Sequence, residues 1–219
     1  MKNRLFFLLL LFVGLHTTAQ SINGIDNTFS IKLNPLALID VYGSYSYRIG
    51  TEFKIHKNYA ASIEVGNYFN YGKKDGIRDN SKGYIVKPEI KMYLNKEGLS
   101  SGVFVSIEYE YKKIAFNYGD SISLPPTPTY YKEYRIYKDI SCITLKYGQL
   151  KVYRKRFLLE WFLGAGIRIC KGSNTLPAVE DNAILTGENH GSEIGWGQRN
   201  VNYVLPNFSI GLKLGYSFR

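Results

Sequence analysis

The sequence has few residues of several types that mark familiar protein classes. It holds only two Cys, two Met and three His among 219 residues. Three histidines leave few candidates for a general base or a metal ligand. Beyond residue 20 no apolar run is long enough for a membrane-spanning helix, which excludes a helical membrane protein.

Aromatic residues, by contrast, are abundant. Nineteen Tyr and twelve Phe bring the aromatic content to 15%, while charged residues make up 21%. A chain this aromatic is not typical of a disordered protein. Its length suits a single β domain.

Residues 1–19 have the pattern of a secretory signal peptide. Lys2 and Arg4 precede an apolar stretch, residues 5–15, and small residues follow it. The stretch is too short to cross a bilayer as a helix. We expect export and a mature domain of residues 20–219. Losing two basic and no acidic residues lowers the formal net charge from +10 to +8.

Alternation of apolar and polar residues dominates the mature chain. In the C-terminal segment, 208–219, every even position is apolar or aromatic, and every odd position is Ser, Gly, Lys or Arg. A period of two predicts a strand whose two faces meet different environments. Eight segments alternate in this way: 29–34, 45–55, 61–66, 86–94, 103–112, 142–148, 159–170 and 208–219.

The connections between these segments distinguish two kinds of barrel. A soluble barrel buries its apolar face, whereas a membrane barrel turns that face to lipid. Connections after the second, fourth and sixth segments are short, and those after the third, fifth and seventh are long. The long ones comprise 71–83, about twenty residues from Asn117, and 171–205. This asymmetry is typical of outer-membrane barrels with periplasmic turns and external loops.

Aromatic residues gather near the ends of the predicted strands, as a girdle at the membrane interface requires. They are Tyr45, Tyr47, Phe69, Tyr71, Tyr109, Tyr111, Tyr216 and Phe218. We predict an all-β fold, an eight-stranded antiparallel up-and-down transmembrane β-barrel in the cell outer membrane. A soluble periplasmic lipid-binding barrel remains an alternative.

Three short motifs carry a family resemblance over most of the mature chain. They are Ile-Lys-Leu-Asn-Pro-Leu at 31–36, Lys-Pro-Glu-Ile-Lys at 87–91 and Gly-Tyr-Ser-Phe-Arg at 215–219. The chain resembles the small outer-membrane barrel proteins of Bacteroidetes-type bacteria, which have OmpA/OmpX-like barrels. The resemblance implies recognition of the aromatic C-terminal strand by barrel-assembly machinery, although Arg219 here follows the aromatic residue. It implies no activity.

The polar faces of the strands would fill the barrel with charge. An eight-stranded barrel is only wide enough for its side chains to meet, so these charges must pair. The predicted interior cations are Lys32, Arg48, Lys54, Lys87, Lys91, Lys112, Lys146, Arg168 and Lys213, and the acids are Glu52, Glu64, Glu89, Glu108, Glu110 and Glu160. We expect structural ion pairs and no open pore. Whether the interior ever conducts stays open.

Both cysteines, Cys142 and Cys170, fall on the polar register of neighbouring strands. A turn centred near Lys155 would bring them close to one another, within reach of a disulfide if the register is favourable. A disulfide and two free thiols both remain open.

Catalytic candidates are few. His56 lies in a short turn, whereas His190 and Ser192 would share a face of an extended segment. Lipid A-modifying outer-membrane hydrolases place a similar pair near the external rim, so this activity is an alternative. The pair lies within the longest connection, among glycines, with no predicted strand to fix its geometry. We therefore predict no enzyme and no catalytic residue.

No metal, cofactor or nucleic-acid site is predicted. Glu180, Asp181, Glu188 and Glu193 lack the spacing of a calcium loop. External cations suit the phosphates of lipopolysaccharide better than they suit nucleic acid; they are Lys73, Lys74, Arg78, Lys82, Lys132 and Arg135. We expect a monomeric structural or surface-interaction protein of the cell envelope, with outer-membrane lipid and lipopolysaccharide as partners. The sequence does not identify the ligand of its external loops.

Overall fold

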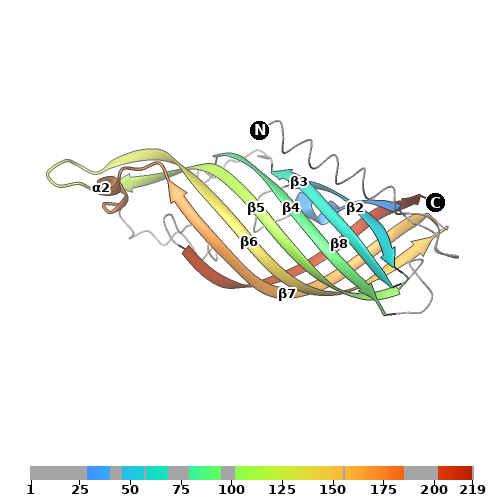
Figure 1. Cartoon of the computed structure of the whole chain (residues 1–219). Coiled ribbons are helices and arrows are strands. Elements are labelled where there is room, and N and C mark those ends of the chain that lie inside the picture. Colours follow the sequence, from blue (N-terminus) through green and yellow to red (C-terminus); the bar gives the residue numbers. More distant parts are fainter. Residues whose placement is uncertain are drawn as a thin grey trace, which may run out of the picture.

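The computed structural model describes residues 29–39, 46–56, 58–68, 79–94, 102–154, 156–184 and 202–218. Eight strands pair in chain order and close into a barrel, each antiparallel to its neighbours (Figure 1). The strands are β1 (Phe29–Leu33), β2 (Ser46–His56), β3 (Tyr59–Tyr68), β4 (Asp79–Tyr93), β5 (Gly102–Ile122), β6 (Tyr130–Tyr153), β7 (Phe157–Asn174) and β8 (Asn202–Phe218). The predicted all-β, eight-stranded antiparallel fold is confirmed.

Two short helical segments accompany the strands. The 3-10 helix η1 (Pro35–Ile39) follows β1 and packs against β2 and β8. The α-helix α2 (Ala178–Asp181) follows β7. No helix in the described part of the chain is long and apolar enough to cross a membrane.

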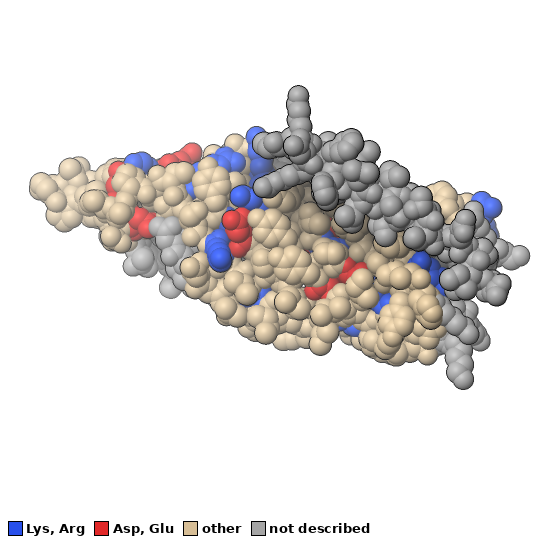
Figure 2. Space-filling model, viewed as in Figure 1, with Lys and Arg blue, Asp and Glu red and all other residues tan. Residues whose placement is uncertain are grey.

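The barrel wall has the reverse polarity of a soluble protein. Outward side chains such as Ile143 and Leu145 are 57% and 66% exposed, whereas inward Lys91 and Glu160 are 0% and 1% exposed. Successive residues of a strand point to opposite faces, so the alternation in the sequence produces this arrangement directly. On the face shown in Figure 2, the wall consists largely of uncharged side chains.

The barrel is much longer on one side than on the other. At the short-turn end, the chain reverses between β2 and β3, between β4 and β5, and between β6 and β7. At the opposite, extended end, β5 and β6 continue as a hairpin beyond the other strands, with α2 beside its far part (Figure 1). The prediction of a loop of about twenty residues from Asn117 is wrong, because only residues 123–129 separate these two strands.

The polarity of the hairpin reverses along its length. Up to Tyr111 the outward residues of β5 are apolar, and beyond it they are Lys113, Ala115, Asn117, Gly119 and Ser121. Over the same stretch the inward residues change from mostly charged to mostly apolar: Ile114, Phe116 and Ile122 are buried, together with Asp120. This reversal hides the full length of β5 in the sequence. The alternation that puts apolar residues at odd positions stops at Lys112, although the strand continues.

Candidate functional site

The barrel interior consists of three layers. An apolar layer at the short-turn end contains Ala60, Tyr93, Phe104, Leu150, Leu158 and Phe162. A layer of buried Lys and Glu residues fills the middle. A second apolar cluster, which includes Ile85, Ile114, Phe116 and Ile140, continues into the hairpin. An ion moving along the axis would therefore meet apolar side chains on both sides of the charged layer.

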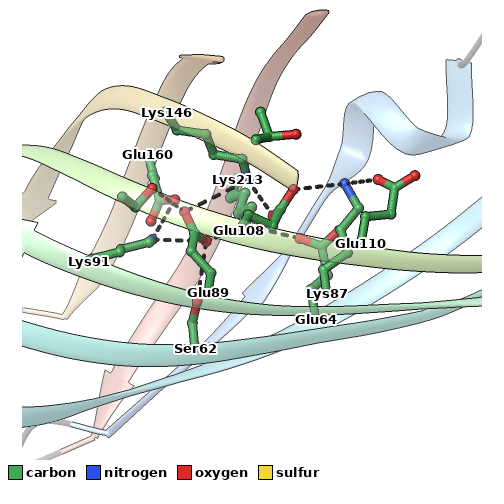
Figure 3. A network of polar contacts seen from close by, with 12 residues as sticks. Ser62, Glu64, Lys87, Glu89, Lys91, Glu108, Glu110, Lys146, Glu160 and Lys213 are labelled. Atoms are coloured by element: carbon green, nitrogen blue, oxygen red, sulfur yellow. Dashed lines mark hydrogen bonds and ion pairs between the residues drawn. The ribbon is translucent and has the colours of Figure 1, made fainter. Parts of the chain in front are cut away.

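Lys91 is central to the charged layer (Figure 3). Its ammonium group lies 2.7 Å from a carboxylate oxygen of Glu52 and 2.7 Å from one of Glu160. Lys32 binds the same two carboxylates, at 2.8 Å and 2.5 Å. The hydroxyl of Tyr93 donates a hydrogen bond of 2.9 Å to Glu52, joining the charged layer to the apolar layer below.

The network continues across the other strands. Glu89 lies 3.8 Å from Lys91 and 3.7 Å from both Lys146 and Lys213, and Ser62 and Ser106 donate hydrogen bonds to it. Lys146 also pairs with Glu108. When one lysine is removed from this network, the carboxylates that it paired with stay buried. They are then still desolvated but have lost part of the compensating positive charge.

Lys87 and Lys213 bring in the remaining acids. Lys87 lies 2.8 Å from Glu110 and 3.4 Å from Glu108. Lys213 lies 3.0 Å from Glu64. Beside this last pair the lumen holds a cavity of about 10 Å³, lined in part by Lys32, Lys91 and Lys213, which is the size of one water molecule.

Aromatic rings close the charged layer at the short-turn end. The Lys91 ammonium lies 4.6 Å from the centre of the Phe104 ring, and those of Lys146 and Lys213 lie 4.2 Å and 5.3 Å from the Phe162 ring. These cation–π contacts add to the ion pairs in a site where water is largely excluded. The arrangement pairs most of the buried charge of the described residues, although Glu64 Oε1 and Arg168 Nε have no hydrogen-bond partner there.

The predicted interior acids all lie on the inner face. Most of the predicted cations also lie on the inner face, but the prediction fits less well near the ends of the charged layer. Lys54 is at a register irregularity of β2, Lys112 lies over the Tyr68 ring, and Arg168 donates a hydrogen bond to Asn207. Lys138, 1% exposed, was missed because the predicted sixth strand began only at Cys142.

A second feature is the end of the hairpin, which the segment after β7 holds in place. Ile122 pairs with Ile184 through an isolated β-bridge, and the Ser123 N–H donates to the Ala183 carbonyl at 3.0 Å. Lys132 binds Glu180 of α2 at 2.5 Å. The hairpin is thus an ordered projection, which we call the head: β5 beyond Lys112, β6 before Cys142, and residues 175–184.

Both cysteines are buried free thiols. In the β6–β7 ladder Cys142 lies opposite Arg168, and Cys170 lies opposite Ile140. The two thiols are therefore diagonal neighbours, two residue pairs apart along the ladder, and do not face one another.

The histidine candidates are not brought together in the described structure. His56 is exposed at the end of β2, with its ring 6.4 Å from that of Tyr59. His190 and Ser192 lie outside the described residues, as do Glu188 and Glu193. Within the described ranges no cluster of three or more His, Cys, Asp or Glu side chains has the geometry of a metal site.

The predicted external cations have different surroundings. Lys73, Lys74 and Arg78 lie outside the described residues. Lys82 is exposed on β4, whereas Lys132 is paired to Glu180, and Arg135 binds Asn117 at 3.1 Å. Sequence reasoning missed Lys113 and Lys171, which point outward on either side of Asp139 in the β5–β6–β7 ladder.

The closed ring of strands, the ion-paired interior and the apolar outer wall together define an inside-out β-barrel. The chain belongs to the family described as "Protein of unknown function (DUF3575)", whose model matches residues 5–205. No curated protein matches the sequence.

Two solved structures are similar to the chain. One is the N-terminal β-barrel domain of Pseudomonas aeruginosa OprF, at 10% identity and a TM-score of 0.44, covering 88% of this chain and 98% of that one. The other is a major outer membrane protein from Thermus thermophilus, at 14% identity and a TM-score of 0.49, covering 89% of this chain and all of that one.

Proposed function

We propose that this protein is an outer-membrane barrel that does not conduct and is not an enzyme, and that it holds the head above the outer leaflet as an interaction surface. The observation that carries the proposal is the reversal of polarity along β5 and β6. Apolar residues face outward only as far as Tyr111 and Ile143. Beyond them the outward residues of the hairpin are mostly polar or tyrosine, and its interior is mostly apolar, with Asp120 and Lys138 buried among the apolar side chains.

The length of the apolar stretch supports a membrane location. On β5 it runs from Val103 to Tyr111, which agrees with the roughly 9–11 residues that a tilted transmembrane strand needs. Tyr84, Tyr109 and Tyr111 stand at its extended end, where aromatic residues meet lipid headgroups. The extended end would then be external and the short-turn end periplasmic.

The three-layered interior supports a structural role for the charges. Ion pairs bridge strands that are far apart in sequence, such as Lys32 with Glu160 and Lys91 with Glu52. Each of these two pairs bridges strands two places apart in the ring, and the pair of Lys213 with Glu89 joins β8 to β4 on opposite sides of the lumen. Reconstituted protein should accordingly give no ion conductance in a planar bilayer.

Lipopolysaccharide is the lipid partner that the outer surface suits best. Lys113 lies opposite Tyr84 in the β4–β5 ladder, Lys82 lies two residues before Tyr84 on β4, and Lys171 lies beyond Asp139 in the same row as Lys113. Cations just outside an aromatic row lie at the level of headgroup phosphates, where charge-assisted hydrogen bonds form.

Cysteine labelling on intact cells tests the location and orientation. The parent chain carries Cys142→Ser and Cys170→Ser. Thr129→Cys, in the exposed tip of the head, should react with a membrane-impermeant maleimide, whereas Arg154→Cys, in the exposed β6–β7 turn, should react only after permeabilisation. Recovery of the chain in the soluble periplasmic fraction would favour the lipid-binding alternative and reject our proposal.

A further inference from the structure

The turn between β6 and β7 places basic side chains at the short-turn end of the lipid-facing wall. Lys151, Arg154 and Arg156 are exposed there. The described residues at this end of the strands include no Asp or Glu; they are 29–31, 53–56, 58–60, 92–94, 102–104, 150–154, 156–159 and 215–218. The described part of this end is therefore positively charged.

Arg156 is the basic residue of this turn that the fold holds most firmly. Its backbone N–H donates to the Tyr153 carbonyl at 3.2 Å, and its own carbonyl accepts from the Ser217 N–H at 2.8 Å. Its Nη1 donates to the Tyr216 hydroxyl at 2.7 Å, and its guanidinium lies 5.9 Å from the centre of that ring. A guanidinium has five N–H donors, and this bond uses one of them. The side chain can thus stay on Tyr216 and still bind an anion with two parallel hydrogen bonds.

Aromatic rings lie beside Arg156 on the outward face. Phe157 and Tyr216 are opposite one another in the β7–β8 ladder, with ring centres 5.7 Å apart, and the Tyr216 ring lies 5.1 Å from that of Phe218. The Phe218 ring in turn lies 6.0 Å from that of Phe29 on β1. Such a group of rings is typical of the interface between hydrocarbon and headgroups.

The outer face of β7 places Arg156 at the level of a lipid headgroup. The outward side chains of β7 from Phe157 to Ile169 are uncharged, and this stretch lies between Arg156 and Lys171. A strand of that length spans about 40 Å, or about 28 Å across the membrane at a tilt of about 45°. The hydrocarbon core has about this thickness. Arg156 therefore meets headgroups of the periplasmic leaflet when Lys171 meets those of the external leaflet.

We propose that Arg156, held by Tyr216, binds the phosphate of an anionic glycerophospholipid in the periplasmic leaflet. The proposal rests on the membrane location and orientation argued above, and it adds a lipid partner at the opposite end of the wall. The ligand carries an anion directly next to hydrocarbon, because the guanidinium stands beside Phe157, where the apolar wall begins. A zwitterionic headgroup would bring a cation close to Lys151 and Arg154, so an acidic lipid such as phosphatidylglycerol is preferred.

Quenching of Trp161 fluorescence tests the site in reconstituted vesicles. Trp161 is on the outer face of β7, five residues from Arg156, or about 16 Å along the strand. Trp196→Phe removes the other tryptophan. The vesicles mix phosphatidylcholine and phosphatidylglycerol, and one lipid at a time carries brominated acyl chains that quench on contact. We expect a preference for phosphatidylglycerol of about five-fold, the factor that ~1 kcal/mol per basic residue near anionic lipid gives.

Three variants of this chain separate a built site from general attraction. Arg156→Gln should bring the two lipids close to equal affinity. Tyr216→Phe keeps every charge but removes the hydroxyl that holds the guanidinium, so part of the preference should be lost. Lys54→Gln is the matched control, because it removes one positive charge at the same end, on β2, three strands around the ring from β7. It should keep the preference.

The outcomes separate this proposal from the proposed function. Equal losses in Arg156→Gln and Lys54→Gln, or a full preference in Tyr216→Phe, would reject the site. Loss of the preference in excess inorganic phosphate, at matched ionic strength, would indicate a site for the free anion and would reject a lipid ligand. In each of these cases brominated phosphatidylcholine still quenches Trp161, and the membrane location stands. Absence of quenching by either lipid would instead reject the membrane location.

Discussion

At the scale of single residues, Lys91 shows how the interior charges stabilise the barrel. In Lys91→Met, the close ion pairs of Glu52 and Glu160 described above are reduced to those with Lys32. Removing one member of a buried network costs about 3–5 kcal/mol, because the acids stay desolvated. We expect a loss of that size in the free energy of unfolding, measured in urea with refolded protein in lipid.

The matched control is Lys113→Met. Lys113 also pairs with an acid, Asp139 at 3.7 Å, but both side chains are nearly half exposed. An exposed pair contributes about 0–1 kcal/mol. Equal losses for both variants would show that burial of the network does not set its strength.

Gly211 makes room for an aromatic ring inside the barrel. A Cβ atom there would lie 2.2 Å from Phe162 Cζ and 2.4 Å from its Cε1. Gly211→Ala should therefore lower the free energy of unfolding by about 1–3 kcal/mol through overpacking. Gly50→Ala is the control, since its nearest contact, the Ile63 carbonyl oxygen, is 3.4 Å away. A stability loss at Gly50 as large as that at Gly211 would contradict the packing argument.

The interior acids were predictable residue by residue. Glu52, Glu89 and Glu160 each fall on the polar phase of a clear alternation, and a strand turns that phase to one side. Their partners were not predictable, because pairs such as Lys32 with Glu160 depend on where strands end up around the ring. Sequence spacing carries no information on that point.

At the scale of elements, the head depends on Ile122. This side chain is 0% exposed and bridges to Ile184. Ile122→Asp buries an unpaired charge and should separate residues 175–184 from the hairpin. We expect new cleavage sites for an added protease in the head, while the barrel keeps its gel shift. Ser121→Asp, its exposed neighbour on the other face of the strand, should remain resistant.

The head was the part of the fold that the sequence analysis misjudged. Ile114, Phe116 and Tyr118 sit on the face that holds Glu108 and Glu110 a few residues earlier, so the alternation changes sign within one strand. If each face of a strand is assumed to keep one polarity, the residues after Lys112 show no regular alternation. In the proposed membrane location, the surroundings of the strand change from lipid to water along its length, which reverses the pattern without ending the strand.

At the scale of the whole molecule, the direction of the apolar wall decides between the membrane and the soluble barrel. Leu145→Arg places a charge on the outward face near the middle of the apolar stretch and should cost about 2–4 kcal/mol in a bilayer. In a soluble barrel the same exposed position would accept Arg with little loss. Unfolding in lipid measures the difference.

Tyr131→Arg is the control for this substitution. Tyr131 lies on the same face of β6 and is 62% exposed, but it belongs to the head. We expect little change in stability there. An equal tolerance at both positions would place Leu145 in water.

The strand count, antiparallel order and closure followed from alternation and connection length alone, because a ring of two-faced strands has few other solutions. The early end of β1 did not follow. Residues 29–34 alternate as cleanly as any other segment, and nothing in them reveals that β1 ends at Leu33 and that η1 begins at Pro35.

The ladder between β5 and β6 runs without interruption from Gly102–Leu150 to Ile122–Tyr130. The tip of the head therefore has no hinge that would let it swing independently of the wall. In the proposed orientation, a molecule bound at Tyr130 or Tyr131 would be held at a fixed height and angle above the membrane. Such a projection would hold a bound molecule rigidly and would not act as a flexible tether.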